Sequence, residues 1–202
     1  MMKSLLALAS VGSTAAFAPS MEGRASSSLA SQVSKSIPFL LAPEKLDGTM
    51  PGDVGFDPMG LSDIQTDLRY ARWAELKHGR VCMLAVTGMV WQEYFPHLPG
   101  AAYATKDPWE AISSPGFGAN IQILLAIGVV ELINWDETFN GDSRPGDIGW
   151  TGAGFDKLDE AGKAKRYEQE IVHCRLAMIA FIGATHQTFL LHKGLLDFSA
   201  PN

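Results

Sequence analysis

Glutamate, histidine, arginine and methionine recur at the same spacing in two distant parts of this chain. The first copy reads Glu75-Leu-Lys-His-Gly-Arg-Val-Cys-Met83, and the second, 95 residues later, reads Glu170-Ile-Val-His-Cys-Arg-Leu-Ala-Met178. Each copy leads directly into an apolar stretch. Charged side chains beside a membrane-like segment are costly unless other groups satisfy them. The repeat is therefore the part of the sequence that indicates function most directly.

Helical geometry limits how these charges can neutralise one another. Glu75 and His78 lie about 60° apart around a helix and share a face, whereas Arg80 lies about 140° from Glu75. For two equivalent helices the economical solution is reciprocal, with Arg175 bound to Glu75 and Arg80 bound to Glu170. Removing one partner of a buried pair of this kind costs about 3–5 kcal/mol.

Such pairs leave one oxygen of each carboxylate free and leave both histidines unexplained. A carboxylate oxygen and a neutral imidazole nitrogen are suitable axial ligands for a metal held in a flat macrocycle. Magnesium, a hard cation, suits oxygen and nitrogen ligands. Small residues beside the ligands would permit a helix or a flat pigment to approach closely; they are Gly79, Ala85, Gly88, Ala177, Ala180 and Gly183. The competing interpretation is that the glutamates serve only as ion-pair partners.

Three long helical segments must position these groups. The pattern predicts helices over residues 63–94, over 119–135, and from 157 or 161 to about 191. The middle segment would extend about 25 Å, close to the thickness of the hydrocarbon core. The connectors repeat as well, because Pro51-Gly-Asp-Val-Gly-Phe-Asp57 has a counterpart in Pro145-Gly-Asp-Ile-Gly149 with Phe155-Asp156.

The expected fold is an all-α membrane protein with three transmembrane helices. The first and third would form a crossed pair related by a pseudo-two-fold axis along the membrane normal. Basic residues gather at the starts of both repeat helices, whereas residues 92–118 hold one, Lys106. The positive-inside rule then puts both helix N-termini on the cytoplasm-equivalent side. Trp73, Trp91, Trp109 and Trp135 are interpreted as interfacial anchors.

The N-terminus reads as targeting sequence rather than as part of the fold. Residues 1–17 form a predicted signal peptide, and the serine-rich residues 18–37 form a transit segment or a disordered mature N-terminus. The three-helix domain then covers 38–202. A net charge of −6 argues against nucleic-acid binding. Cys82 and Cys174 are interpreted as small packing residues, since they lack metal-ligand spacing.

The motifs together resemble the light-harvesting chlorophyll-binding superfamily. The resemblance covers about residues 38–192 and is carried by the Glu-x-x-His-Gly-Arg motif at Glu75, by Phe56-Asp-Pro-Met-Gly-Leu61 and by Arg175-Leu-Ala-Met-Ile-Ala180. The presequence around Phe17-Ala-Pro19 looks like that of the fucoxanthin chlorophyll a/c branch. That branch implies a thylakoid membrane in a plastid of secondary, red-algal origin, and a stromal side for the repeat N-termini.

The resemblance implies axial magnesium ligands on all three helices. They are Glu75, His78, Glu170, His173, Gln187, Gln122 and Glu131, with Arg80 and Arg175 as ion-pair partners. His173 stands where the family usually has asparagine, so its pigment is expected in an altered geometry. Gln122 and Gln187 are alternatively interhelical hydrogen bonders. His186 and His192 are interpreted as helix-end or interfacial residues rather than as ligands.

The connector motifs resemble the segments that hold xanthophyll end groups. Phe56, Asp57 and Pro58 would contact one carotenoid, and Phe155 and Asp156 a second, although the second copy lacks the proline. The implied cofactors are chlorophyll a, chlorophyll c and fucoxanthin or a related xanthophyll. The implied partners are a photosystem core, other antenna subunits and thylakoid lipids.

The leading hypothesis is an antenna protein that absorbs light and passes excitation to a photosystem; it is not an enzyme. One alternative is a photoprotective relative that dissipates excitation, for which the acids Glu93, Asp107 and Glu110 of the first lumenal loop are the only hints. Another is a small membrane transporter with charges along an ion path. A colourless native protein would favour the transporter.

Overall fold

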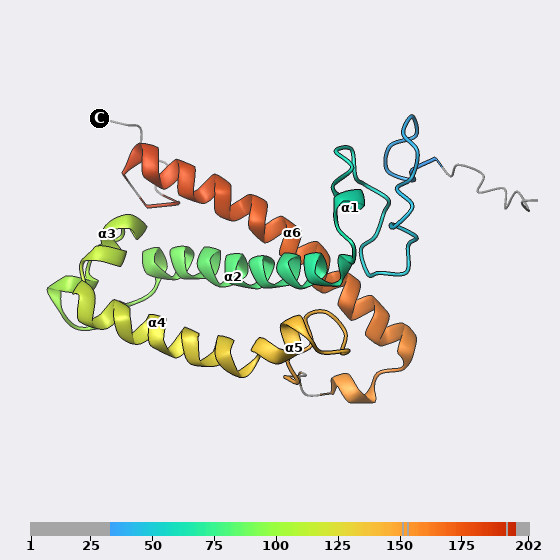
Figure 1. The fold of residues 1–202 in the computed structure, drawn as a ribbon. Coiled ribbons are helices and arrows are strands. Elements are labelled where there is room, and N and C mark those ends of the chain that lie inside the picture. The colour runs from blue at the N-terminus through green and yellow to red at the C-terminus, as the bar shows by residue number, and fades with distance from the viewer. Residues whose placement is uncertain (1–32, 151, 153, 193, 197–202) are drawn as a thin grey trace, which may run out of the picture. The chain divides into compact units, whose positions relative to one another are not determined.

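The computed structural model describes residues 33–150, 152, 154–192 and 194–196. The predicted signal peptide and most of the transit segment lie outside these residues. The α-helices are α1 (Leu61–Ile64), α2 (Leu68–Tyr94), α3 (Pro108–Ser113), α4 (Gly116–Ile133), α5 (Trp135–Phe139) and α6 (Glu160–Leu191), as Figure 1 shows. The only β pairing in the described chain is one isolated bridge between Val33 and Leu41. The all-α prediction is confirmed.

The predicted helix over 63–94 is two helices, not one. Gln65 is extended and ends α1, and Asp67 is the N-cap of α2, where its side chain accepts a hydrogen bond from the Arg69 N–H. An aspartate side chain that bonds the backbone two residues ahead favours a cap over a helix interior. The predicted single helix was therefore wrong at its start and correct at its end, Tyr94.

The centre of the fold is the contact between α2 and α6, which run obliquely past each other (Figure 1). Leu76 from α2 and Ile171 and Cys174 from α6 form its buried core. A Cβ on Gly79 would overlap the Cβ and Sγ atoms of Cys174. The helices can approach this closely only because Gly79 has no side chain. Cys82 and Cys174 are both free thiols, as expected of packing residues.

Two described helices, α4 and α6, are long and apolar enough to cross a membrane, and α2 does not meet the same criteria. None of the side chains of α4 is buried, although its 18 residues are almost all apolar. A helix that is apolar on every side and not covered by protein fits a lipid environment. Composition thus supports two of the three predicted spans.

The loops hold more structure than the sequence suggested. The middle helix runs from Gly116 to Ile133 rather than over 119–135, and the short helix α5 follows it. Helix α3 forms in the predicted loop, where the Asp107 carboxylate caps it and Pro108 occupies its first turn. These short helices matter because α3 carries Trp109 to the surface of α6.

Of the predicted interfacial tryptophans, Trp73 is buried and Trp109 makes a contact between helices. Trp73 is only 2% exposed and belongs to the protein interior, so its assignment as an anchor was wrong. The Trp109 indole Nε1 donates to the Thr188 hydroxyl at 3.2 Å, and its ring packs edge-on against Phe189. Trp109 therefore fastens α3 to α6. Tryptophan combines a large apolar area with one donor, which suits either an interface or a docking contact.

Candidate functional site

Two ion pairs join α2 and α6 reciprocally. Arg80 donates through Nε and Nη2 to Glu170 Oε1 at 2.9 and 2.6 Å, and Arg175 donates through Nε to Glu75 Oε1 at 2.7 Å. All four side chains are partly buried. The structure thus brings together the partners that helical spacing had matched across the two motif copies. Each glutamate uses Oε1 for its interhelical bond.

The second oxygen of Glu75 is also bonded, which sequence reasoning missed. Arg72 Nη1 donates to Glu75 Oε2 at 2.7 Å, and the Arg72 side chain is buried. An arginine three residues before a glutamate is a recognisable helical pair, so the spacing held a signal. The position that corresponds to Arg72 in the second copy, 95 residues on, is Tyr167. The two carboxylates therefore have different surroundings, because Glu75 binds two guanidinium groups and Glu170, among the described residues, binds one.

The repeated connectors each pack on the helix of the other copy. Gly52 lies over Ile171, where an added Cβ would come within 2.6 Å of a side-chain carbon, and its carbonyl accepts from Arg175 Nη1 at 2.8 Å. Gly146 lies over Leu76 in the same way, and a Cβ there would overlap that side chain. Both glycines have positive φ, which disfavours any other residue. The first connector therefore holds Arg175 through the Gly52 carbonyl, and the second packs against Leu76.

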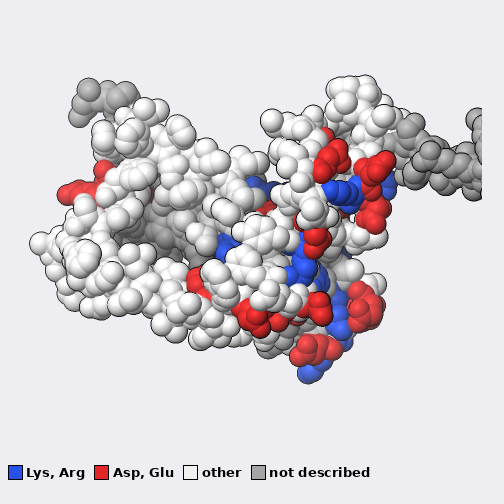
Figure 2. Space-filling model, in the orientation of Figure 1, with Lys and Arg blue, Asp and Glu red and all other residues white. Residues whose placement is uncertain are grey.

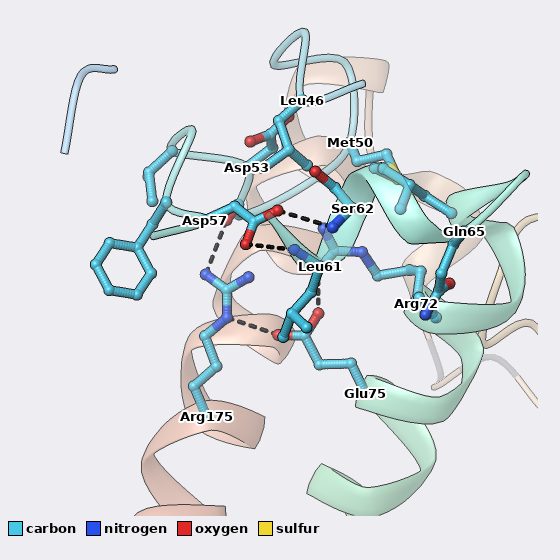
Figure 3. A pocket seen from close by; sticks show the side chains of 15 residues that line it. Leu46, Met50, Asp53, Asp57, Leu61, Ser62, Gln65, Arg72, Glu75 and Arg175 are labelled. Atoms are coloured by element: carbon cyan, nitrogen blue, oxygen red, sulfur yellow. Dashed lines mark hydrogen bonds and ion pairs between the residues drawn. The ribbon is translucent and has the colours of Figure 1, made fainter. Parts of the chain in front are cut away.

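Two clefts open between these connectors and the helices. The first, of about 550 Å³, is lined by Phe56, Asp57, Glu75 and Arg175 among others, and Figure 3 shows its polar floor. The second, of about 430 Å³, is lined by the corresponding set in the other copy, which includes Arg80, Phe155, Tyr167 and Glu170. Pro58 and Asp156 are not among the lining residues of either cleft. Each cleft thus joins a connector aromatic residue to an ion pair.

Asp57 organises the wall of the first cleft. Its carboxylate accepts from the backbone N–H groups of Leu61 at 3.0 Å and Ser62 at 2.8 Å (Figure 3). Ser62, and after it the Leu61 backbone donor, lowers the pKa of Asp57 below its usual value of 3.8. Asp57 therefore stays ionised and anchors the start of α1. Its observed contacts are with the protein backbone.

The two repeat histidines have the same geometry. His78 Nδ1 lies 2.7 Å from the Ala74 carbonyl, and His173 Nδ1 lies 2.7 Å from the Gln169 carbonyl. A carbonyl can only accept, so in the neutral ring the proton is on Nδ1 and Nε2 keeps its lone pair. Both rings are exposed. This is the tautomer and orientation of a histidine that binds a metal through Nε2.

The remaining predicted ligands differ in how they are held. Glu131 on α4 pairs with Lys77 on α2 at 2.5 Å, with both side chains close to half-exposed. Gln122 is exposed on α4. The Gln187 amide Nε2 donates to the Leu195 carbonyl at 2.8 Å. That bond turns the amide oxygen of Gln187 away from the chain segment 194–196, since the two amide atoms lie on opposite sides of the same carbon.

Charge is segregated along the structure. On the face shown in Figure 2, lysine, arginine, aspartate and glutamate gather over the connectors and the first halves of α2 and α6. The side that carries α4 is mostly uncharged on that face. In the sequence of each helix, the residues of the ion pairs and the histidine stand directly before its apolar stretch. A boundary of this kind is typical of a protein partly embedded in lipid.

Comparison with known proteins gives one family. The sequence pattern of the family described as "Chlorophyll A-B binding protein" matches residues 42–189. The chain is 36% identical over 178 residues to chlorophyll a-b binding protein P4 of Pisum sativum, a match that covers 80% of this chain and 69% of the relative. It is 32% identical over 206 residues to a fucoxanthin-chlorophyll a-c binding protein of Chattonella marina var. antiqua, covering 94% and 93% respectively. A similar protein of Trieres chinensis is 31% identical over 201 residues, covering 90% and 92%.

Proposed function

Because this chain belongs to the chlorophyll a-b binding protein family, we propose that it is a light-harvesting subunit that binds chlorophyll a, chlorophyll c and a fucoxanthin-type xanthophyll. The family relation by itself makes the chain a pigment-binding antenna protein and not an enzyme. Proteins of this family associate with photosystems and other antenna subunits, and the relatives named above are chloroplast proteins.

The choice of the chlorophyll a/c branch rests on the extent of the match. The alignments with the two fucoxanthin-chlorophyll proteins cover 92–93% of those relatives, against 69% of the Pisum sativum protein. The identities are similar, so the share of each relative's length that is matched favours the a/c branch. We infer the same pigments for this chain, and a thylakoid membrane of a plastid of red-algal ancestry.

The ligand atoms available in the structure suit magnesium. His78 and His173 use Nδ1 for the bond to a carbonyl and leave Nε2 available, and the carboxylate of Glu170 has an oxygen without a bonded donor among the described residues. These are the nitrogen and oxygen ligands that a hard divalent cation prefers. Glu75 and Gln187 would complete the set on α2 and α6, and Gln122 and Glu131 would bind on α4. To bind magnesium, Glu131 would have to break its ion pair with Lys77, share the paired oxygen between Lys77 and the metal, or bind the metal through its other carboxylate oxygen.

Bound chlorophyll would supply the absorption of visible light and the transfer of excitation. The protein would hold each pigment ligand at a fixed place, because the helices that carry the ligands are held rigidly against each other. The two arginines lock α2 to α6, and the buried core around Cys174 prevents the helices from sliding. The clefts at Phe56 and Phe155 are the places we assign to carotenoid end groups. Fixed distances between pigments then follow from fixed helices.

We propose three membrane spans, with α2 and α6 as a crossed pair. Helices α4 and α6 support this by length and composition, and the 27 residues of α2 extend about 40 Å, enough to cross a bilayer. The charged first halves of α2 and α6 would lie at the stromal surface, as the positive-inside rule requires.

The observation that carries the proposal is the pair of Nδ1-anchored histidines beside reciprocal ion pairs. Its test is the pigment content of the purified protein. Replacing His78 by Phe, or His173 by Phe, should remove one chlorophyll per polypeptide. His173→Asn should retain it, because an amide oxygen can also bind magnesium. Unchanged chlorophyll in both Phe variants would refute the ligand assignment.

The acids that hinted at a dissipating role have structural partners. Glu93 accepts from the Leu196 N–H at 2.9 Å, Asp107 caps α3, and Glu110 accepts from the Thr105 hydroxyl at 2.7 Å. Because each of these acids has a structural contact, its presence does not require a dissipating role, and the antenna function is favoured. Fluorescence lifetimes of the native protein at pH 7 and pH 5 separate the two functions, since strong quenching at pH 5 would indicate dissipation.

A further inference from the structure

A third histidine, His186 on α6, shares the geometry of the two repeat histidines. Its Nδ1 lies 3.1 Å from the Ile182 carbonyl, one helical turn earlier. The same argument places the proton on Nδ1 and leaves Nε2 with a free lone pair. The side chain is exposed. His192, by contrast, ends α6 in a left-handed conformation, as expected of a helix-end residue.

His186 points away from the protein interior. The buried residues nearest to it on α6 are Ala184 and Thr188, which are 6% and 0% exposed. Each is two residues from His186 and so lies about 160° away around the helix. Thr188 is also the residue that receives Trp109 from α3. His186 is therefore on the outer side of α6, opposite the contacts that α6 makes in this region.

The surroundings of His186 are apolar. Residues one turn away on the same side, Ile182, Phe189 and Leu190, are all well exposed. Side chains on a helix lean toward its N-terminus, so the surface covered by His186 lies over the preceding turn. Gly183 occupies that turn, and a Cβ added there would meet nothing within 4 Å. A flat ring could lie against this part of α6 without a clash.

We propose that His186 binds an additional magnesium tetrapyrrole of the chlorophyll type through Nε2, on the outer face of α6. This inference rests on the proposed function, because an imidazole acceptor facing hydrocarbon is costly only if α6 spans a membrane. The magnesium ion of such a pigment would satisfy that acceptor. Gln187 is the next residue and points about 100° away, so the two ligands serve separate pigments.

Pigment stoichiometry of the purified full-length protein tests the inference. His186→Leu should lose one chlorophyll per polypeptide, and His186→Gln should retain it. Leucine suits a lipid-facing position, so His186→Leu should keep its helix content by circular dichroism and its chlorophyll at the other sites. His78→Phe serves as the reference variant that loses one chlorophyll if the proposed function is correct.

The outcomes separate the two claims. If His78→Phe loses a chlorophyll and His186→Leu keeps the wild-type content, the inference is wrong and the proposed function stands. If neither variant loses chlorophyll, the ligand assignment of the proposed function fails, and the inference fails with it. Loss from His186→Leu that His186→Gln does not restore would assign His186 a packing role and also overturn the inference.

Discussion

Gly79 and Cys174 lie directly against each other in the contact between α2 and α6, and they are also the same position in the two motif copies. In the proposed arrangement, a residue that faces its own counterpart lies on the axis relating the copies. Little space exists there, because a Cβ on Gly79 would overlap Cys174. Only one copy can carry a side chain at this position, so the difference between the copies has a steric reason.

Replacing Gly79 by Ala should separate the helices and weaken the whole structure. Overpacking of a core costs about 1–3 kcal/mol, and the added methyl group has no direction in which to move. Gly88→Ala is the matched control, because a Cβ at Gly88 meets nothing within 4 Å. Thermal unfolding followed by circular dichroism should show a lower midpoint for Gly79→Ala only. Equal midpoints for the two variants would contradict the assignment.

A compensating change sharpens this test. In Gly79→Ala combined with Cys174→Gly, the side chain moves from one copy to the other, and the overlap disappears. The double variant should regain much of the midpoint lost in Gly79→Ala. A midpoint that stays low would mean that the two residues do not share one steric constraint.

The two carboxylates should respond differently to loss of an arginine. Arg80→Gln leaves Glu170 without a cation among the described residues, whereas Arg72→Gln leaves Glu75 bound to Arg175. The side chains of Arg80 and Glu170 are 32% and 29% exposed, so the cost of breaking that pair falls below the ~3–5 kcal/mol of a fully buried pair, to roughly 1–3 kcal/mol. Arg80→Gln should therefore lower the unfolding midpoint more than Arg72→Gln. The reverse order would show that Arg72 is the main support of the site.

The sequence predicted the interhelical pairs because helical periodicity and duplication together leave few ways to neutralise Glu75 and Glu170. The sequence also predicted the end of α2 at Tyr94, before Pro96. It missed the break before Asp67, where a local side-chain bond competes with the apolar pattern. It also assigned Trp73 to an interface, since burial of an aromatic residue depends on tertiary packing and not on its neighbours in sequence.

Arg72 shows a second limit of sequence reasoning. Its role depends on rotamer choice, because a basic residue at the start of a helix can face solvent or turn back to a glutamate three residues later. In the structure it turns back and is buried. Trp109 is similar, since its donor reaches Thr188, 79 residues away in sequence. Contacts of this kind become visible only when the elements are assembled.

Acid should weaken the first connector through Asp57. Its pKa is lowered in the folded protein by hydrogen bonding from Ser62 and from the Leu61 backbone N–H. A depressed pKa adds stability above the unfolded-state value of 3.8, and that stability is lost as pH falls through the folded-state pKa. Because Asp57 is only partly buried, the contribution is small, about 0.5 kcal/mol or less.

Asp57→Asn removes the charge and keeps an acceptor oxygen. At pH 7 the variant should unfold at a slightly lower temperature than the wild type. The difference should shrink as pH falls below 3.8 and disappear once Asp57 is protonated in the folded wild type. A difference that persists unchanged at the lowest pH would assign the effect to shape rather than to charge.

The last turn of α2 and the chain after α6 are joined by Glu93, and this contact supports a predicted pigment ligand. Both Glu93 oxygens accept from the Leu196 N–H, at 3.2 and 2.9 Å, and the neighbouring Leu195 carbonyl binds the Gln187 amide. Glu93→Ala should free residues 194–196 and release Gln187 from its fixed orientation. The expected result is faster proteolysis after α6 and partial loss of one chlorophyll, with helix content unchanged.

Glu110→Ala is the control, because Glu110 is an acid of the same loop region that binds Thr105 and not the segment after α6. It should leave both proteolysis and pigment content as in the wild type. Glu93→Gln keeps one acceptor oxygen, so it should behave between Glu93→Ala and the wild type. If Glu93→Ala speeds proteolysis after α6 without changing pigment content, the bond to the Leu195 carbonyl is not needed for pigment binding by Gln187. Its position on α6 would then be enough to orient it as a ligand.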